Sequence, residues 1–374
     1  MKVSILQENL AKIVGAAARN VSSRPQLPVL ANILLKTEKG RLIAVGTDMM
    51  TSVGLAAGGK VEEEGAVTVP GRDLAALAAG LPAGTVELSS DGSALTVIAG
   101  RTRAKLMGMS AEDFPEVDGK GKKAFEVDRE AWEEAMERVL ICVSPDEGRP
   151  ILTGVKIEPI DQGPRAKGQG LKDIKLTATD GYRLVIVEVG VEKLELDEVV
   201  IIPARTLGEA VRLAGGKTLT VELTDDGGVA FKFEDGWVKG KLLAGEFPAV
   251  DKITPQEFEA EITIDRGELE KAVKLAAIFA RESANIIRWT IVEGMVTVAA
   301  NSPQIGENET AVEVSGKGSG EIAFNSRYLL DLLGSVGEAE RLTFKMAGPL
   351  KPGVFGIEGD KNFKHVIMPV RVQK

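Results

Sequence analysis

The sequence predicts an α+β protein made of three repeated domains, each with two helices packed on antiparallel sheets. The chain has 374 residues, which is enough for two or three domains of ordinary size. Segments with alternating apolar residues, typical of strands, surround amphipathic helices, and the same order of elements occurs three times. Because only 4% of the residues are aromatic, aliphatic side chains must fill most of the cores.

Each repeat opens with a short alternating strand that runs into an amphipathic helix. We expect the first helix to begin at Gln7. We expect the other two to begin at Asp128 and Asp265, because an aspartate carboxylate can accept hydrogen bonds from the free N–H groups of a helix start. The three opening segments are residues 2–21, 124–143 and 261–280.

Two strands that reach a polar turn follow each opening helix. The turn pairs Lys39-Gly40 and Glu293-Gly294, with alternating residues on both sides, predict hairpins. In the second repeat, extra length at residues 161–170 indicates a long loop. The three hairpin segments end at Asp48, Asp180 and Ser302.

A second helix, introduced by a further strand, follows in each repeat and is spaced by roughly one domain length. The helix starts are marked by Pro70, Pro203 and Asn325. Each repeat then closes with a similar pair, which is Phe114-Pro115, Phe247-Pro248 or Met368-Pro369. We therefore expect domains at residues 1–121, 122–256 and 257–374, with the first boundary inside the linker 119–123.

Sheets in such a unit leave edge strands that need partners. Three domains joined end to end still have two open ends. Pairing two chains about a two-fold axis closes the assembly, as is usual for homo-oligomers. We therefore expect a homodimer.

The composition and the rarest residues exclude several classes of function. No stretch approaches the roughly 20 apolar residues of a membrane span, and the first residues lack the apolar core of a secretion signal, so we expect a cytoplasmic protein. With one cysteine, Cys142, and one histidine, His365, we expect no disulfide, no metal site and no cofactor. The better interpretation of Cys142 is a buried structural thiol.

An enzyme is also disfavoured. Gly216-Lys217-Thr218 ends like a phosphate-binding loop, but that motif needs a glycine where Val211 stands, and it needs a strand before it rather than a helix. Without a nucleophile and base in a recognisable pattern, we expect no catalytic residues.

The net charge of −9 and the pI near 5.1 argue against nonspecific adhesion to nucleic acid. A role on DNA therefore requires basic residues gathered on one face.

Six segments in order along the repeats are similar to those of one known family. They are residues 24–28 (RPQLP), 46–48 (GTD), 178–184 (ATDGYRL), 246–248 (EFP), Phe324-Asn325 with Tyr328, and 367–371 (IMPVR). Over its whole length the chain resembles the bacterial DNA polymerase III beta subunit, the beta sliding clamp. The resemblance implies a non-enzymatic processivity factor in DNA replication, a head-to-tail dimeric ring with pseudo-six-fold symmetry that encircles double-stranded DNA without sequence readout.

The resemblance implies partners as well. They are the replicative DNA polymerase, an ATP-dependent clamp loader and other proteins with clamp-binding motifs, which insert short peptides into an apolar pocket between the second and third domains. Methionine and aliphatic walls suit varied apolar side chains, while Arg and Asn would fix the peptide backbone. The matching positions are Leu152, Thr179, Gly181, Tyr182, Arg183, Leu184, Pro248, Ile253, Asn325, Tyr328, Leu350, Pro352, Val366, Ile367, Met368, Pro369, Val370 and Arg371.

The resemblance also implies that helices line a central hole, where cations face phosphate. One departure is the first helix of the second repeat, which carries four glutamates between residues 130 and 137. The candidate DNA-facing residues are Lys12, Arg19, Arg24, Arg72, Arg149, Arg205, Arg212, Lys217, Lys271, Lys274, Arg281 and Arg327.

By the same resemblance, Ala104 and Leu106 of the first domain contact Ile278 and Phe279 of the third domain of a second chain. A second hypothesis stays open at this point. It is a repeat-built scaffold for protein interactions that shares the fold but never encloses DNA.

Overall fold

The computed structural model describes residues 1–22, 24–117, 121–160, 172–250 and 253–371. The predicted loop 161–170 and the first part of the linker 119–123 lie outside the described residues. The chain divides into two compact units. The N-terminal unit comprises Met1–Glu130, Val191–Leu196 and Arg205–Leu242, and the C-terminal unit comprises Ala131–Gly190, Asp197–Ala204 and Leu243–Lys374.

The N-terminal unit contains two antiparallel sheets. Its strands are β1 (Lys2–Leu6), β2 (Asn32–Glu38), β3 (Arg41–Thr47), β4 (Thr51–Gly58), β5 (Lys60–Glu63), β6 (Ala66–Pro70), β7 (Thr85–Ser90), β8 (Ala94–Ala99), β9 (Thr102–Met107), β10 (Gly121–Asp128), β15 (Thr218–Thr224), β16 (Gly228–Phe233) and β17 (Gly236–Lys241). One sheet has the order β5-β1-β7-β8-β9, and the other has the order β10-β15-β16-β17-β4-β3-β2-β6.

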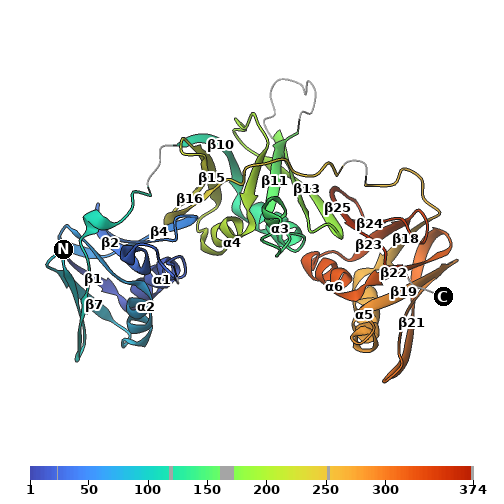
Figure 1. Ribbon diagram of the computed structural model, residues 1–374, viewed down its shortest axis with the longest axis horizontal. Coiled ribbons are helices and arrows are strands. Elements are labelled where there is room, and N and C mark those ends of the chain that lie inside the picture. The colour runs from blue at the N-terminus through green and yellow to red at the C-terminus, as the bar shows by residue number, and fades with distance from the viewer. Residues whose placement is uncertain (23, 118–120, 161–171, 251–252, 372–374) are drawn as a thin grey trace. The chain divides into compact units, whose positions relative to one another are not determined.

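The helices of this unit are α1 (Gln7–Ala18), α2 (Gly71–Gly80) and, from Arg205 on, α4 (Ala204–Leu213), together with the short helices η1 (Pro28–Ala31) and η2 (Ala111–Asp113). Figure 1 shows α1 and α2 beside each other. Leu10, Ile13 and Val14 of α1 are buried against the sheet. Gly46 lets α1 approach β3 closely, because a Cβ there would lie 2.0 Å from the carbonyl oxygen of Ala17.

The C-terminal unit contains a twelve-stranded sheet with the order β14-β11-β12-β13-β25-β24-β23-β18-β21-β20-β19-β22. The strands are β11 (Gly154–Pro159), β12 (Lys172–Thr179), β13 (Arg183–Val191), β14 (Val200–Pro203), β18 (Ala260–Asp265), β19 (Ile286–Val292), β20 (Met295–Ser302), β21 (Gly306–Gly318), β22 (Gly320–Asn325), β23 (Arg341–Met346), β24 (Gly353–Ile357) and β25 (Asp360–Ile367).

The C-terminal unit contains α3 (Arg129–Leu140) from Ala131 on. It also contains all of η3 (Pro150–Thr153), α5 (Arg266–Ala280) and α6 (Ser326–Ser335). In Figure 1, α5 and α6 lie beside each other. Trp289, Phe324 and Phe344 are fully buried in this unit, with ring centroids 5.2 to 6.0 Å apart and edge-to-face angles.

The predicted fold class is confirmed, since helices and strands recur in the predicted order in all three repeats. The carboxylate of Asp265 caps α5 by accepting the N–H of Glu268 at 2.8 Å, and Asp128 accepts the N–H of Glu130 at 3.0 Å. Lys39 and Gly40 both have positive φ, 51° and 74°, as a tight hairpin turn requires.

Each unit contains a sheet that continues from one repeat into the next. In the N-terminal unit β4 of the first repeat pairs with β17 of the second. In the C-terminal unit β13 of the second repeat pairs with β25 of the third. The compact units therefore do not coincide with the repeats, and the domain boundaries expected at 121 and 256 stay a prediction.

Two further features bear on the classes of function considered above. Among the described residues no helix has the length and apolar character needed to cross a membrane, and no group of three or more His, Cys, Asp or Glu side chains is placed to hold a metal ion. Cys142 is fully buried, as predicted.

Candidate partner-binding site

The turn between β12 and β13 is held by its own side chains. The Asp180 Oδ1 atom accepts the N–H groups of Tyr182 (2.8 Å) and Arg183 (2.9 Å). The hydroxyl of Thr179 accepts the N–H of Gly181 at 3.1 Å and donates to the carbonyl of Arg183 at 2.6 Å. Gly181 has a φ of 94°, which glycine adopts without strain. The turn is therefore well defined, and it leaves the Tyr182 side chain exposed.

The end of the chain lies beside this turn. β25 pairs antiparallel with β13, and Val366 lies opposite Leu184. The strand ends at Ile367, as expected for a segment followed by Met368-Pro369, because proline has no N–H for the ladder. The N–H of Met368 donates to the carbonyl of Tyr182 at 2.8 Å. The Met368 side chain is thereby held next to the turn.

A shallow hollow that is partly open to solvent lies between the turn and the chain end. Its floor is apolar, because Leu184 and Val366 are buried and pack in one cluster with Val250 and Val354. Its described lining consists of Thr179, Gly181, Tyr182, Arg183, Leu184, Ile253, Val366 and Met368. All eight belong to the set expected from sequence.

The structure places the other ten expected residues outside the described lining. Tyr328 contacts the lining, because its ring stacks on that of Tyr182 with centroids 6.5 Å apart. Asn325 is used within the protein, where its side chain accepts the N–H of Arg327 and caps α6. Leu350 is exposed, whereas Leu152 and Ile367 are buried. The role of these residues, and that of Pro248, Pro352, Pro369, Val370 and Arg371, stays a prediction.

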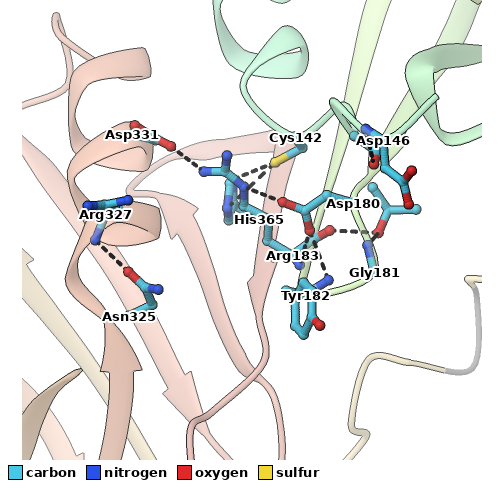
Figure 2. A network of polar contacts seen from close by, with 12 residues as sticks. Cys142, Asp146, Asp180, Gly181, Tyr182, Arg183, Asn325, Arg327, Asp331 and His365 are labelled. Carbon is cyan, nitrogen blue, oxygen red and sulfur yellow. Dashed lines mark hydrogen bonds and ion pairs between the residues drawn. The ribbon is translucent and has the colours of Figure 1, made fainter. Parts of the chain in front are cut away.

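Arg183 carries the one charged side chain in the described lining, and its charge is compensated (Figure 2). Its Nε donates to Asp180 Oδ2 at 3.0 Å and its Nη1 to Asp331 Oδ2 at 2.6 Å. Its guanidinium carbon also lies 4.6 Å from the centre of the Tyr328 ring. Burial disfavours the charge, but the hydrogen bond to Asp331 and the nearby carboxylates outweigh it and raise the pKa of Arg183.

Cys142 and His365 are buried beside this network, with the Cys142 sulfur 3.9 Å from each ring nitrogen of His365 (Figure 2). Burial, together with the charge of Arg183, lowers the pKa of His365 to about 3. Burial also raises the pKa of the Cys142 thiol far above its usual range. Both groups are therefore neutral near pH 7, and Cys142 is a structural thiol rather than a nucleophile.

The first repeat contains the same turn at Asp48, where the sequence predicts the corresponding polar turn. Asp48 Oδ1 accepts the N–H groups of Met50 and Thr51 at 3.0 and 2.8 Å, as Asp180 does for its own turn. The hollow beside it, about 420 Å³, has a different floor, because Ser52 lies opposite Lys239 where the second turn has Leu184 opposite Val366. Of these two turns, the second alone borders an apolar hollow.

The twelve basic residues expected to face DNA are all exposed. Five of them form ion pairs, namely Arg149 with Asp146, Arg205 with Asp48, Arg212 with Glu209, Lys271 with Glu268, and Lys274 with Glu270. Within the described part of the chain, no ion pair involves Lys12, Arg19, Arg24, Arg72, Lys217, Arg281 or Arg327.

The residues expected at a dimer contact lie on two different elements. Ala104 and Leu106 are half-buried on β9, which ends the order of its sheet in the described residues. Ile278 of α5 is 48% exposed and Phe279 is half-buried. Exposed Arg103 and Lys105 alternate with the apolar residues of β9.

Comparisons with known proteins agree along the whole chain. Residues 1–118, 126–249 and 251–371 match the N-terminal, central and C-terminal domains of the DNA polymerase III beta subunit. The beta sliding clamp of Streptomyces coelicolor is 30% identical and that of Caulobacter vibrioides 28%, each with 100% of both chains covered. The Pseudomonas aeruginosa and Bartonella birtlesii clamps, both solved bound to griselimycin, have TM-scores of 0.89 and 0.90 at 27% and 26% identity over 100% of both chains.

These matches confirm the resemblance seen in the sequence and decide against a scaffold unrelated to DNA replication. The repeated α+β fold, the full-length domain matches and the full-length relatives all agree. The chain therefore belongs to the DNA polymerase III beta subunit family, the beta sliding clamps, which are non-catalytic processivity factors of DNA polymerase.

Proposed function

We propose that two copies of this chain form a closed head-to-tail ring around duplex DNA in the cytoplasm, and that the ring tethers the replicative polymerase and other partners through the hollow at Thr179–Leu184. The clamp loader and other clamp-binding proteins use the same site. The observation that carries the proposal is the hollow itself, which combines a rigid turn, an apolar floor and an exposed rim. Retention on DNA then comes from closure of the ring rather than from affinity.

The size and chemistry of the hollow define its ligand. A shallow, partly open hollow with an apolar floor suits one or two apolar side chains of a docked segment rather than a folded surface. Ile253 and Met368 on the rim are 37% and 40% exposed, so they are free to close over a docked side chain. The ligand is therefore a short peptide segment, and griselimycin, which related clamps bind, is a suitable probe.

Replacing both rim residues, Ile253→Ala with Met368→Ala, should weaken griselimycin binding by more than about tenfold, since central apolar contacts of a small interface contribute about 2 kcal/mol each. Isothermal titration calorimetry measures the affinity. The matched control is Val292→Ala with Met295→Ala, which removes similar side chains, 49% and 39% exposed, from the β19–β20 hairpin. Equal affinities of the rim variant and the wild type would reject the assigned pocket.

The dimer follows from the pairing pattern of the sheets. β4 pairs with the last strand of the next repeat, and β13 does the same. The corresponding strand of the third repeat is β21. Its first half, residues 306–313, pairs with β20 on one side. On the other side, β18 pairs with residues 314–318 of β21 and leaves the first half without a partner among the described residues. Among the described residues, β9, the last strand of the first repeat, is paired in its sheet with β8 alone. We infer that β21 of one copy pairs with β9 of the other.

The charges of these two edges are complementary. Glu307 and Glu309 alternate along β21, and Arg103 and Lys105 alternate along β9. In an antiparallel pair, Glu309 lies opposite Arg103 when Glu307 lies opposite Lys105, and such cross-strand pairs of opposite charge stabilise a ladder. Ala104 and Leu106 then face the Ile278 and Phe279 side of the partner copy.

Charge reversal tests this dimer directly. A variant with Arg103→Glu and Lys105→Glu, and a second with Glu307→Lys and Glu309→Lys, should each be monomers of 39.7 kDa, because like charges then face each other at both contacts. Mixing the two variants should restore a dimer that contains one copy of each. Native mass spectrometry resolves these species. Dimers in either variant alone, or no dimer on mixing, would contradict the pairing.

Electrostatic attraction to DNA should depend on a few exposed cations. Arg205 and Lys274 already pair with Asp48 and Glu270, so replacing them would also break ion pairs within the protein. A better test replaces arginines that form no ion pair among the described residues.

The triple variant Arg24→Glu, Arg72→Glu and Arg281→Glu should slide faster along circular DNA once loaded, and its sliding rate should depend less on salt, since fewer phosphate charges are compensated. The control, Lys351→Glu, Lys361→Glu and Lys364→Glu, makes the same change in net charge at other exposed positions. The sliding rate is measured by single-molecule fluorescence across a salt series. If both triple variants behaved alike, the chosen arginines would not face the DNA.

A further inference from the structure

The wall of the hollow depends on a residue outside it. Arg183 forms part of the wall, yet its side chain is only 10% exposed, and two carboxylates hold it from opposite directions. Asp180 lies in the same turn, three residues away. Asp331 lies on α6, 148 residues later in the chain. The position of the wall is therefore tied to that of α6.

Helix α6 is a firm support for this contact. The side chain of Asn325 caps its start, and Leu329, Leu332 and Leu333 are buried beneath it. Residues three apart lie on one face of a helix. Tyr328 and Asp331 have this spacing and both reach Arg183, the ring at 4.6 Å and the carboxylate at 2.6 Å. The tyrosine ring also stacks on Tyr182.

The shared use of Asp180 links this contact to the shape of the turn. Oδ2 of Asp180 accepts from the Arg183 side chain, while Oδ1 accepts the backbone N–H groups of Tyr182 and Arg183. If Arg183 lost its hold on α6, its guanidinium would compete with the backbone for Asp180. The carbonyl of Tyr182, which binds the N–H of Met368, would then shift too.

We propose that Asp331 is a positioning residue for the peptide site, which it shapes through Arg183 without lining the hollow. The inference rests on the proposed function of that hollow. It also specifies the ligand. Because Arg183 is compensated by Asp180 and Asp331, the hollow selects uncharged apolar side chains and gains nothing from an acidic residue placed at Arg183.

Removing the charge of Asp331 tests the proposal. Asp331→Asn should weaken griselimycin binding about fivefold or more by calorimetry, and Asp331→Glu, which keeps the carboxylate, should recover part of the loss. The matched control is Asp360→Asn. It removes another carboxylate of the same unit, which pairs at 3.3 Å with the largely buried side chain of Arg138. The control should bind griselimycin as the wild type does. Dimer mass and melting temperature should be the same in all three variants.

A double-mutant cycle separates a specific effect from a general one. If Asp331 acts through Arg183, then Asp331→Asn should weaken binding little further in an Arg183→Gln background. Additive losses, or equal losses in Asp331→Asn and Asp360→Asn, would overturn the proposal. A wild-type protein that fails to bind griselimycin would instead overturn the proposed function of the hollow. Unchanged binding by Asp331→Asn beside a binding wild type would overturn only the role of Asp331.

Discussion

Pairing of strand edges is the constraint on which the rest of the structure depends. An exposed edge presents unpaired N–H and C=O groups that favour association with another strand. Here β4 finds its partner in β17, and β13 finds its partner in β25, so a sheet passes from one repeat into the next. Applied to β21 and β9, the same rule supports the proposed pairing with a second copy of the chain. In the proposed ring, these two edges close on each other.

The hollow proposed as the partner site is a consequence of this pairing. Where β13 meets β25, the turn before β13 and the residues after β25 are brought together, and a hollow forms between them. The first junction has the same turn geometry around Asp48, yet Lys239 lies on its floor. The ammonium of Lys239, paired there with Asp226 at 3.0 Å, makes that floor polar. Side chains, rather than backbone, therefore distinguish the apolar hollow at one junction from the polar hollow at the other.

The repeats, helix starts and hairpins could be predicted from the sequence because they depend on local signals. Asp265 caps a helix wherever the rest of the chain lies, and Lys39-Gly40 turns for reasons of backbone conformation alone. The compact units could not be predicted, since they depend on which strands pair between repeats. The hollow was found through its resemblance to a known family rather than through any local pattern.

The parts of the site that were missed are long-range. Asp331 and Arg183 are separated by 148 residues, and nothing in the sequence near Asp331 indicates an ion pair with the second repeat. A weak signal did exist, because Asp331 follows Tyr328 by three residues and so shares its face of the helix. The polar floor at Ser52 and Lys239 could likewise be recognised only when the strand register was available.

The most direct measurement of the central claim is retention of the loaded protein on circular and on linear DNA of the same sequence. Fluorescently labelled protein is loaded onto a nicked circle by an ATP-driven clamp loader, the circle is then cut once, and the bound fraction is followed with time. A closed ring held by topology should stay on the circle and slide off within the dead time after cutting. Equal retention on both forms would contradict the account, because it would mean that contact with DNA, and not closure of the ring, holds the protein in place.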